Sequence, residues 1–435
     1  MAAINWIVYT YFGFYVYYLF FFAVASRFPR KRKSNISMST GIQHPVSRIK
    51  HHIPSTNFQA PISKYQVSSI QYPASSISNV LTKKLHRFAV LFPVYKEDRI
   101  IMESVRTFFA QEYPKDAFDV FVLADSLSDV TIRELRLLGA EVIIISGENR
   151  TKAKALNLAM NSLDSDRYDL CVVFDADNIV EPSFLSSVNE EFNNGIMALQ
   201  CHRVAKNLDT PIAYLDALSE EIANSMLRKG HRAVGFSSGL IGSGMVFEFL
   251  LFKYVMSSIH ATNGFDKDLE FALFKNRIEI EYADHILVYD EKVQSADVLQ
   301  HQRTRWFAAQ WKNIRKGFRS LREHYTTDGF NKWLQMIMLP RIFLLMATSV
   351  LTLVAMISAD GTTALRWMHL ELMLIAAFFI AIPNSLYRKE LLDAILSFPK
   401  AVKALFGALL NIRAANKGFL HTPHSASSVT IIGGN

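Results

Sequence analysis

The stretch Leu170-Cys171-Val172-Val173-Phe174-Asp175-Ala176-Asp177-Asn178 organises the interpretation of the whole chain. Its first five residues are apolar and include β-branched side chains, which predicts a buried strand. Two carboxylates at i and i+2 end this strand, so we expect a turn at its carboxyl end, where open α/β sheets bind ligands. Carboxylates held together suit Mg²⁺ or Mn²⁺ carrying a phosphate. The alternative is an exposed turn with two solvated aspartates, and the rest of the sequence has to distinguish it from a metal site.

Strand-like and helix-like segments alternate around this stretch. Apolar strands are expected over Phe88 to Val94, Asp119 to Ala124, Glu141 to Ile145 and Ile196 to Val204, and helices from Asp98 through Phe108, over Lys152 to Met160 and over Thr210 to Arg228. This alternation predicts an α/β fold with a doubly wound, mostly parallel sheet and right-handed crossovers. Asp125 would then lie on the same sheet edge as Asp175 and Asp177, and Asp129 is expected to cap the next helix.

Composition sets the class of protein. The 435 residues are 50% hydrophobic and 12% aromatic, which is enough for one large α/β domain plus membrane segments. A net charge of +8 suits either nucleic acid or a membrane surface. Five basic residues between positions 27 and 33 directly follow an apolar stretch, so we favour the lipid bilayer and expect no nucleic-acid partner. The two cysteines, Cys171 and Cys201, support neither a disulfide framework nor a cysteine-based zinc site.

The stretch from Ile4 to Ala25 contains no charged residue and is long enough to span a bilayer. A signal peptide would carry its positive charge before the apolar core, whereas here the charge follows it. We therefore predict a retained anchor over residues 1–33, with the basic flank holding the next segment in the cytoplasm. A helix lying in the membrane interface is the alternative, although no polar face is visible. Residues 34–86 are interpreted as a linker or a segment on the membrane surface.

Two more spans are predicted within residues 331–390, after a catalytic domain over residues 87–330. They cover Leu334 to Ala359, interrupted at Pro340-Arg341, and Trp367 to Leu386. For residues 391–435 we favour an interfacial or re-entrant helix over Leu391 to Ile412, followed by a cytoplasmic tail, over a fourth span. Three spans place the amino terminus outside and the catalytic domain in the cytoplasm, in a multi-pass protein of the inner (plasma) membrane.

Cations precede the acidic turn in the run Arg150-Thr151-Lys152-Ala153-Lys154. The dipole of a helix disfavours cations at its start, so this run suggests a bound anion, with a solvated basic turn as the alternative. Neither Gly-x-Gly-x-x-Gly nor Gly-x-x-x-x-Gly-Lys occurs in the chain, which weakens a dinucleotide-binding or P-loop interpretation.

Three later motifs could complete a site. The glycines of Gly239-Leu240-Ile241-Gly242-Ser243-Gly244 would let backbone approach a bulky ligand, or would simply form a flexible loop. The segment from Gly264 to Glu270 places Asp266, Asp268 and Glu270 at a helix start, where a carboxylate could serve as a base. The helix that carries Gln302, Arg305 and Trp306 could bind phosphate and stack on a sugar or base. A basic helix binding lipid headgroups is the alternative.

The order of these motifs resembles the membrane-bound family 2 glycosyltransferases, which include cellulose, chitin and hyaluronan synthases. The matching elements run from Pro93-Val94-Tyr95-Lys96-Glu97-Asp98 through Asp125, Lys152, Asp175-Ala176-Asp177, Gly242-Ser243-Gly244 and Lys267-Asp268 to Gln302-Arg303-Thr304-Arg305-Trp306. The resemblance implies a glycosyltransferase A fold, a nucleotide-activated sugar as donor, a divalent metal and an inverting displacement. We expect the donor to be a UDP-sugar. Two positions depart from the family pattern, because Lys267 replaces the usual glutamate before the base and Ala124 replaces the first of two paired aspartates.

Roles carried over from the resemblance fall into four groups. Nucleotide-sugar binding is assigned to Pro93, Tyr95, Glu97, Asp125, Lys152 and Asp175. The metal, Mg²⁺ or Mn²⁺, is assigned to Asp177, and the catalytic base to Asp268. The donor and acceptor motif is assigned to Gly242, Ser243, Gly244, Gln302, Arg305 and Trp306. A tail with His421, Thr422 and His424 is expected to gate the site.

Three functions remain open at this point. The first is a glycosyltransferase that extends a glycan for the cell surface or for export, with export partners that the sequence does not identify. The second loads one sugar onto a polyprenyl-phosphate lipid, an activity that the same family includes but typically without Gln-x-x-Arg-Trp. The third, a non-catalytic membrane scaffold, is disfavoured by the intact carboxylates Asp175, Asp177 and Asp268. The expected partners are therefore a nucleotide-sugar donor, a glycan or lipid-linked acceptor, and the bilayer.

Overall fold

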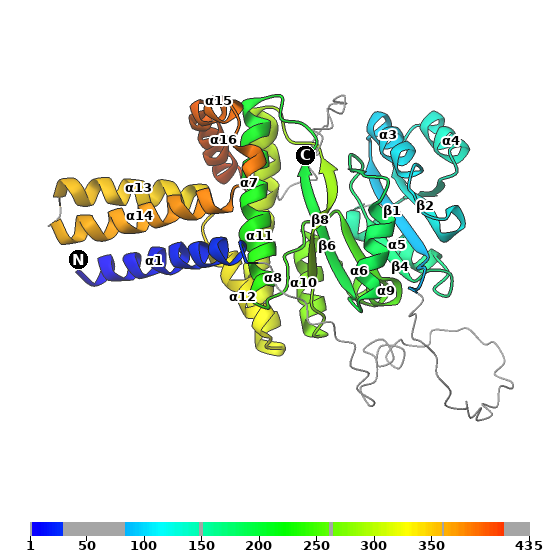
Figure 1. Cartoon of the computed structure of the whole chain (residues 1–435), viewed down its shortest axis with the longest axis horizontal. Helices are drawn as coiled ribbons and strands as arrows, with labels where there is room; N and C mark the ends of the chain where they lie inside the picture. Colours follow the sequence, from blue (N-terminus) through cyan, green and yellow to red (C-terminus); the bar gives the residue numbers. More distant parts are fainter. Residues whose placement is uncertain (1, 29–82, 148–150, 261–263, 359–360, 413–435) are drawn as a thin grey trace, which may run out of the picture.

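The computed structural model describes residues 2–28, 83–147, 151–260, 264–358 and 361–412. Figure 1 shows an α/β domain on one side and a bundle of apolar helices on the other. The expected linker over 34–86, apart from its last four residues, lies outside the described residues, as do Arg150 and the tail residues His421, Thr422 and His424.

The α/β domain is built on an eight-stranded sheet in the order β3-β2-β1-β4-β7-β6-β8-β5. The strands are β1 (Phe88–Tyr95), β2 (Phe118–Asp125), β3 (Glu141–Ile144), β4 (Leu170–Val173), β5 (Ile179–Val180), β6 (Ala198–Ala205), β7 (Met245–Glu248) and β8 (Glu281–Asp290). The first four in this order are parallel, β7 runs antiparallel to both neighbours, and β6 and β8 are again parallel. The predicted mostly parallel α/β sheet is confirmed.

Helices cover both faces of the sheet. They are α3 (Asp98–Phe108), α4 (Asp129–Leu137), α5 (Lys152–Ser162), α6 (Phe184–Asn193), α9 (Phe249–Ser257) and α10 (Phe265–Lys275). Along β1, Ala89 and Leu91 pack in the core with α5 and α9, while Phe88, Val90 and Phe92 pack in the core with α3 and α6. Both faces of this strand are buried, so its sequence is continuously apolar rather than alternating.

The cap of α4 differs from the prediction. Ser128, not Asp129, is the N-cap, and its hydroxyl accepts a hydrogen bond from the backbone N–H of Thr131 at 3.2 Å. Asp129 occupies the first helical turn, where its negative charge still favours the helix dipole. Serine is as good an N-cap as aspartate, so the two adjacent residues could not be separated by preference alone.

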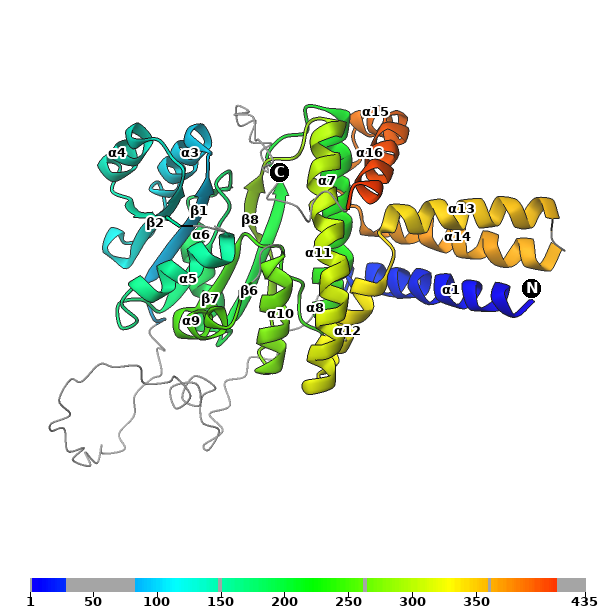
Figure 2. The ribbon, with the colours of Figure 1, turned by 180° about the vertical axis from the view of Figure 1, so that it is seen from behind.

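Three long helices separate the sheet from the apolar bundle, as both views show (Figures 1 and 2). They are α7 (Pro211–Asn224), α11 (Ala296–Glu323) and α12 (Thr327–Ile337). The helix expected over Thr210 to Arg228 starts as predicted, with Thr210 as its N-cap, but continues as a π-helical segment (Ser225–Gly230) and as α8 (His231–Ala233).

The bundle consists of α1 (Ala2–Ala25), α13 (Arg341–Ser358) and α14 (Gly361–Ala381). Among the residues that the structure describes, two helices are long and apolar enough to cross a membrane, within α1 and α14, and a third crossing exists if α12 and α13 count as one bent span. The two members of that pair meet at 57°, so the interruption expected at Pro340 separates a helix along α11 from a helix in the bundle. The third predicted span begins and ends earlier than Trp367 to Leu386.

Two short helices follow the bundle, α15 (Glu390–Leu396) and α16 (Phe398–Leu410). They pack against α7 and α11 instead of extending the bundle (Figure 1). At 7 and 13 residues, each is too short to cross a bilayer of about 30 Å.

The bundle is joined to the α/β domain where α1 crosses the π-helical segment. Gly230 lies there without room for a side chain, because an added Cβ would overlap the carbonyl oxygen of Phe22. The next residue, His231, stacks on the Phe22 ring with the centroids 3.8 Å apart. The absence of a side chain at position 230 therefore sets how closely α1 approaches.

Gly230→Ala is expected to lower the free energy of unfolding by about 1–3 kcal/mol or more, because backbone must move to admit the methyl group. Thermal unfolding in detergent measures the change. Gly361→Ala is the matched control, since an added Cβ at Gly361 meets nothing within 4 Å. Equal melting temperatures for the two variants would contradict the close packing at Gly230.

Candidate active site

A cavity of about 1600 Å³ extends from the carboxyl ends of β1, β2 and β4 to the apolar bundle. Its polar end is lined by residues that follow these strands, namely Tyr95, Glu97, Asp125, Asp175 and Asp177. The parallel pairing of β1 with β2 and β4 brings these strand ends together, as the sequence predicted. Pro93, within β1, also lines the cavity.

The backbone is strained at two of these strand ends. Lys96 and Ser126 have φ values of 58° and 62°, in a region that residues other than glycine rarely adopt. The two turns support each other, because the N–H of Lys96 donates to the carbonyl of Asp125 at 3.2 Å. The Ser126 hydroxyl donates to the Asp125 carboxylate at 2.9 Å. Such strain persists where surrounding structure enforces it and clusters at functional sites.

Lys152 connects the acidic turn to the glycine loop. Its ammonium group, at the start of α5, forms an ion pair with Asp175 and donates to the carbonyl of Gly242 at 2.8 Å. The backbone N–H of Asp175 donates to the side-chain oxygen of Asn178 at 2.9 Å, which closes the turn. The cation and the carboxylate predicted to meet a nucleotide sugar therefore lie in direct contact.

Asp177 is nearly buried, with 3% of its surface exposed, and is held by its neighbours. One carboxylate oxygen accepts from the backbone N–H of Glu291 at 2.8 Å. Asn178 donates to Asp290 at 3.1 Å and thereby ties the turn to the end of β8. In the part of the chain that the structure describes, no group of three or more His, Cys, Asp or Glu residues could hold a metal ion. One or two carboxylates still fit Mg²⁺ or Mn²⁺, which completes its coordination with substrate phosphates and water.

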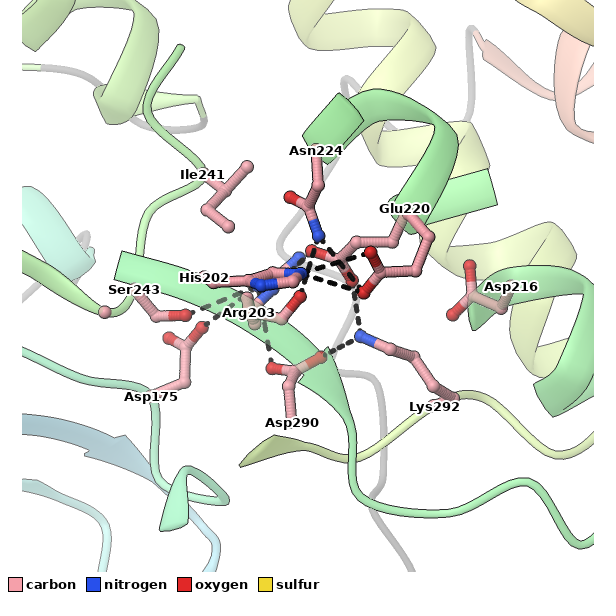
Figure 3. A network of polar contacts seen from close by, with 12 residues as sticks. Asp175, His202, Arg203, Asp216, Glu220, Asn224, Ile241, Ser243, Asp290 and Lys292 are labelled. Carbon is pink, nitrogen blue, oxygen red and sulfur yellow. Dashed lines mark hydrogen bonds and ion pairs between the residues drawn. The ribbon is translucent and has the colours of Figure 1, made fainter. Parts of the chain in front are cut away.

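A buried ion network supports the floor of the polar end (Figure 3). Arg203 of β6 pairs with Glu220 of α7 at 2.7 Å and with Asp290 at 3.6 Å. Lys292 pairs with Glu220 and, at 2.8 Å, with Asp290. Arg203 also approaches Asp175 to 4.0 Å, so the network reaches the acidic turn. Sequence reasoning missed these residues because no motif marks them and they meet only in the folded chain.

The network keeps its members charged. Burial alone would lower the pKa of Arg203, but Asp290 and Glu220 outweigh burial and raise it. Burial alone would raise the pKa of Glu220, but Arg203 and Lys292 hold it well below its usual range. Removing one member would leave a buried charge without its partner, which is strongly destabilising.

The three carboxylates at the start of α10 lie in different surroundings. Asp266 lines the cavity and pairs with Lys267 at 2.9 Å. Asp268 is not among the lining residues and pairs with Lys316 of α11 at 2.7 Å. Glu270 is completely buried, where it accepts from the backbone N–H of Leu240 at 2.7 Å and pairs with Lys332 at 2.6 Å. Glu270 is therefore a structural anchor for the glycine loop.

The remaining motif residues divide between the cavity and the protein core. Gln302, Arg305, Trp306 and Gly242 line the cavity. The guanidinium of Arg303 lies over the Trp306 ring, 3.9 Å from its centroid, and is oriented by an ion pair with Asp216. Ser243 and Gly244 are absent from the lining. Ser243 is fully buried, and its hydroxyl accepts a hydrogen bond from Arg203 of β6 at 3.3 Å. An added Cβ on Gly244 would lie 3.0 Å from Val288, so Gly244 packs closely against β8.

The other end of the cavity is apolar. Side chains from α7, α13, α14, α15 and α16 line it, including Leu218, Leu345, Ile375, Phe378, Ile395 and Leu405. Two of these side chains, Ile375 and Phe378, belong to α14, which is a candidate membrane span. One continuous cavity thus joins a carboxylate-rich end to an apolar end lined partly by a candidate membrane span.

The chain is similar in sequence to known glycosyltransferases. Residues 86–309 match the family described as "Glycosyltransferase like family 2". The chain is 25% identical over 225 residues to the beta-monoglucosyldiacylglycerol synthase of Trichormus variabilis, covering 50% of this chain and 47% of that protein. It is 22% identical over 236 residues to the probable glycosyltransferase YdaM of Bacillus subtilis, covering 52% and 55%. The chain thus spans about half the length of the curated relatives that it matches.

A solved structure supports the fold. The mannosyltransferase PcManGT from Pyrobaculum calidifontis, in complex with GDP-Man and Mn²⁺, superposes with a TM-score of 0.50 at 16% identity. The similarity covers 77% of this chain and 88% of that chain. Agreement over most of both chains at so low an identity shows a shared fold, the glycosyltransferase A architecture expected from the sequence.

Proposed function

We propose that this chain, which belongs to the glycosyltransferase family 2-like proteins, transfers a sugar from a nucleotide sugar, a UDP-sugar, to a membrane-embedded acceptor with inversion. The acceptor hydroxyl oxygen forms a bond to the anomeric carbon while the bond from that carbon to the diphosphate breaks. The hydroxyl proton passes to a carboxylate base, and the nucleoside diphosphate leaves. This reaction needs a bound diphosphate, neutralisation of its charge, and one base.

The residues at the polar end are proposed to bind the donor. Asp125 and the turn after β1 contact the nucleotide, and Asp175 with Lys152 contacts the sugar diphosphate. Lys152 and Arg305 lie on the cavity wall, where their charges oppose the negative charge that grows on the leaving diphosphate. Asp177 is proposed to hold Mg²⁺ or Mn²⁺, which when bound supplies further positive charge to the leaving group.

Asp268 is proposed as the base, because it matches the family's base position at the start of α10. Its ion pair with Lys316 has partly exposed partners, 44% for Lys316 and 21% for Asp268, and such pairs contribute little stability. An approaching acceptor could therefore replace Lys316 at modest cost. Asp266 is the competing carboxylate, since it lines the cavity.

The continuous cavity is the observation that supports a lipid acceptor most strongly. A lipid could place its chains among the apolar side chains from α13, α14 and α16 and its hydroxyl near the donor site. The name of the Trichormus variabilis relative, a diacylglycerol-linked sugar synthase, supports the same class of acceptor. Extension of a growing glycan is the second candidate, supported by the Gln302-x-x-Arg305-Trp306 motif on the cavity wall.

A panel of nucleotide sugars tests the donor proposal. Purified protein is incubated with each donor in lipid vesicles, and release of the nucleoside diphosphate is measured with and without Mn²⁺. UDP-sugars are expected to be turned over faster than GDP-sugars, and chelator is expected to stop turnover. Faster turnover of a GDP-sugar would overturn the nucleotide assignment without affecting the proposed acceptor.

The arrangement of the bundle gives a prediction about topology. The helix α1 begins at the end of the bundle remote from the α/β domain, next to the start of α14 (Figure 1). With the basic flank of α1 in the cytoplasm, a cysteine replacing Gly361 should be labelled from outside intact cells, and one replacing the exposed Leu137 should not. The natural cysteines are buried and give little background. Labelling at position 137 alone would reverse the proposed orientation.

A further inference from the structure

Two arginines lie on the cavity wall between its polar and apolar ends. Arg228 belongs to the π-helical segment, and Arg341 is the first residue of α13, directly after Pro340. Both line the cavity together with Leu339, Pro340 and Leu345. The family motifs include neither arginine, and the donor site described above uses neither.

The polar contacts of both arginines are mostly with neutral groups. Arg228 donates to the carbonyl of Gly239 at 3.2 Å and to the side-chain oxygen of Asn224 at 2.8 Å. Arg341 donates to the carbonyl of Ser219 at 2.8 Å and reaches its hydroxyl at 3.4 Å. Across residues 2–28, 83–147, 151–260, 264–358 and 361–412, no carboxylate lies within ion-pair distance of either guanidinium.

The nearest carboxylates are already shared with other cations. Glu220 attracts both arginines electrostatically, but its carboxylate is already paired with Arg203 and Lys292. Glu270 attracts Arg228 electrostatically, but its carboxylate is already paired with Lys267 and Lys332. Two further cations repel the pair, Arg203 acting on Arg228 and Arg303 acting on Arg341. Arg303 takes the carboxylate of Asp216. The boundary between the two ends of the cavity is therefore positively charged.

We propose that Arg228 and Arg341 form a binding subsite for the anionic headgroup of a lipid, with its phosphate between them and its chains in the apolar end of the cavity. The inference rests on the proposed lipid acceptor and narrows it to an anionic lipid. Two guanidinium groups beside apolar side chains match a phosphate joined to hydrocarbon chains in both charge and polarity. A neutral lipid or a glycan would bring no negative charge to the two guanidinium groups.

Lipid binding tests the subsite independently of sugar transfer. Purified protein in neutral detergent is titrated with dioleoyl phosphatidic acid or with dioleoylglycerol, which carries the same chains without the phosphate, and bound lipid is counted by native mass spectrometry. The wild-type protein is expected to bind phosphatidic acid at least tenfold more tightly. Arg341→Gln and Arg228→Gln are each expected to weaken phosphatidic acid binding by about tenfold and to leave dioleoylglycerol unchanged, since one charge-assisted contact is lost.

Controls separate charge from folding. Arg341→Lys keeps the charge and should retain most of the binding, so equal loss in the Lys and Gln variants would overturn a charge-based subsite. Arg388→Gln removes an exposed arginine that does not line the cavity, and it should bind as the wild type does. Variants are compared only after their melting temperatures match that of the wild type within a few degrees.

Three outcomes would overturn the proposal. Equal affinity for phosphatidic acid and dioleoylglycerol would remove the headgroup subsite. Unchanged binding in both Gln variants would place the phosphate elsewhere. Displacement of the lipid by inorganic phosphate at the same concentration would make this a site for free phosphate. Failure of the proposed function would give a different result. A protein that binds the anionic lipid through Arg341 but transfers no sugar to any lipid would retain the subsite and contradict only the proposed lipid acceptor.

Discussion

Asp177→Asn is expected to lower the rate of sugar transfer at least ~10³-fold while the protein keeps its fold. The substitution preserves side-chain shape and an oxygen that can accept from the backbone N–H of Glu291, as Asp177 does now at 2.8 Å. It removes the negative charge that a hard divalent cation requires. Because the described residues offer no cluster of three metal-ligating side chains, loss of one carboxylate is not compensated by protein neighbours.

The measurement combines transfer rate with metal titration. Wild-type activity should rise with Mn²⁺ or Mg²⁺ and disappear in excess chelator, whereas Asp177→Asn should stay near background at every metal concentration. Asp129→Asn is a matched control, because Asp129 is an exposed aspartate on α4 that is not among the residues lining the cavity. Full turnover of the wild-type protein in chelator would contradict the assignment of Asp177 to a metal.

Asp268→Asn is expected to lower the transfer rate by ~10²–10⁴-fold, the usual effect of losing a general base. Binding of the nucleoside diphosphate should remain within a few-fold of the wild-type affinity, because Asp125, Lys152 and Asp175, and not Asp268, are proposed to hold the donor. Calorimetric titration measures binding, and single-turnover assays measure the rate.

Two companion variants show which part of α10 is responsible. Lys316→Met leaves the Asp268 carboxylate but removes its ion pair, so its rate should stay close to that of the wild type. If Lys316→Met lowers the rate as much as Asp268→Asn does, the ion pair between Lys316 and Asp268 has a structural role and Asp268 is not the base. If Asp266→Asn alone loses the rate while retaining nucleotide binding, the base is Asp266, the carboxylate that lines the cavity.

The sequence predicted those parts of the fold that local patterns determine. The strands β1 and β4 are recognisable because both of their faces are buried, which requires uninterrupted apolar residues. Asp125, at the end of β2, was expected on the same sheet edge as Asp175 and Asp177, and all three line one cavity. Parallel pairing alone is sufficient for this inference.

Long-range contacts were beyond the same reasoning. β7 has only four residues and follows a glycine loop, so its antiparallel position between β4 and β6 has no periodic signal. The Arg203, Glu220 and Lys292 network joins residues up to 89 positions apart, and each residue alone resembles an ordinary surface charge. Pro340 marked the break between α12 and α13 in the sequence. The 57° bend at this break could not be predicted, because it depends on how α12 packs along α11.

The acceptor is the central claim, and the destination of a labelled sugar tests it most directly. Purified protein in vesicles containing phosphatidic acid and neutral lipids is given a radiolabelled UDP-sugar with Mn²⁺, and the products are partitioned between chloroform–methanol and water. We expect the wild-type protein to place the label in the organic phase, and we expect the label to leave that phase when the lipid is removed under mild conditions. The Asp177→Asn protein should place no label in the organic phase. Label found only in a water-soluble or insoluble glycan, with none attached to lipid, would contradict the proposed acceptor.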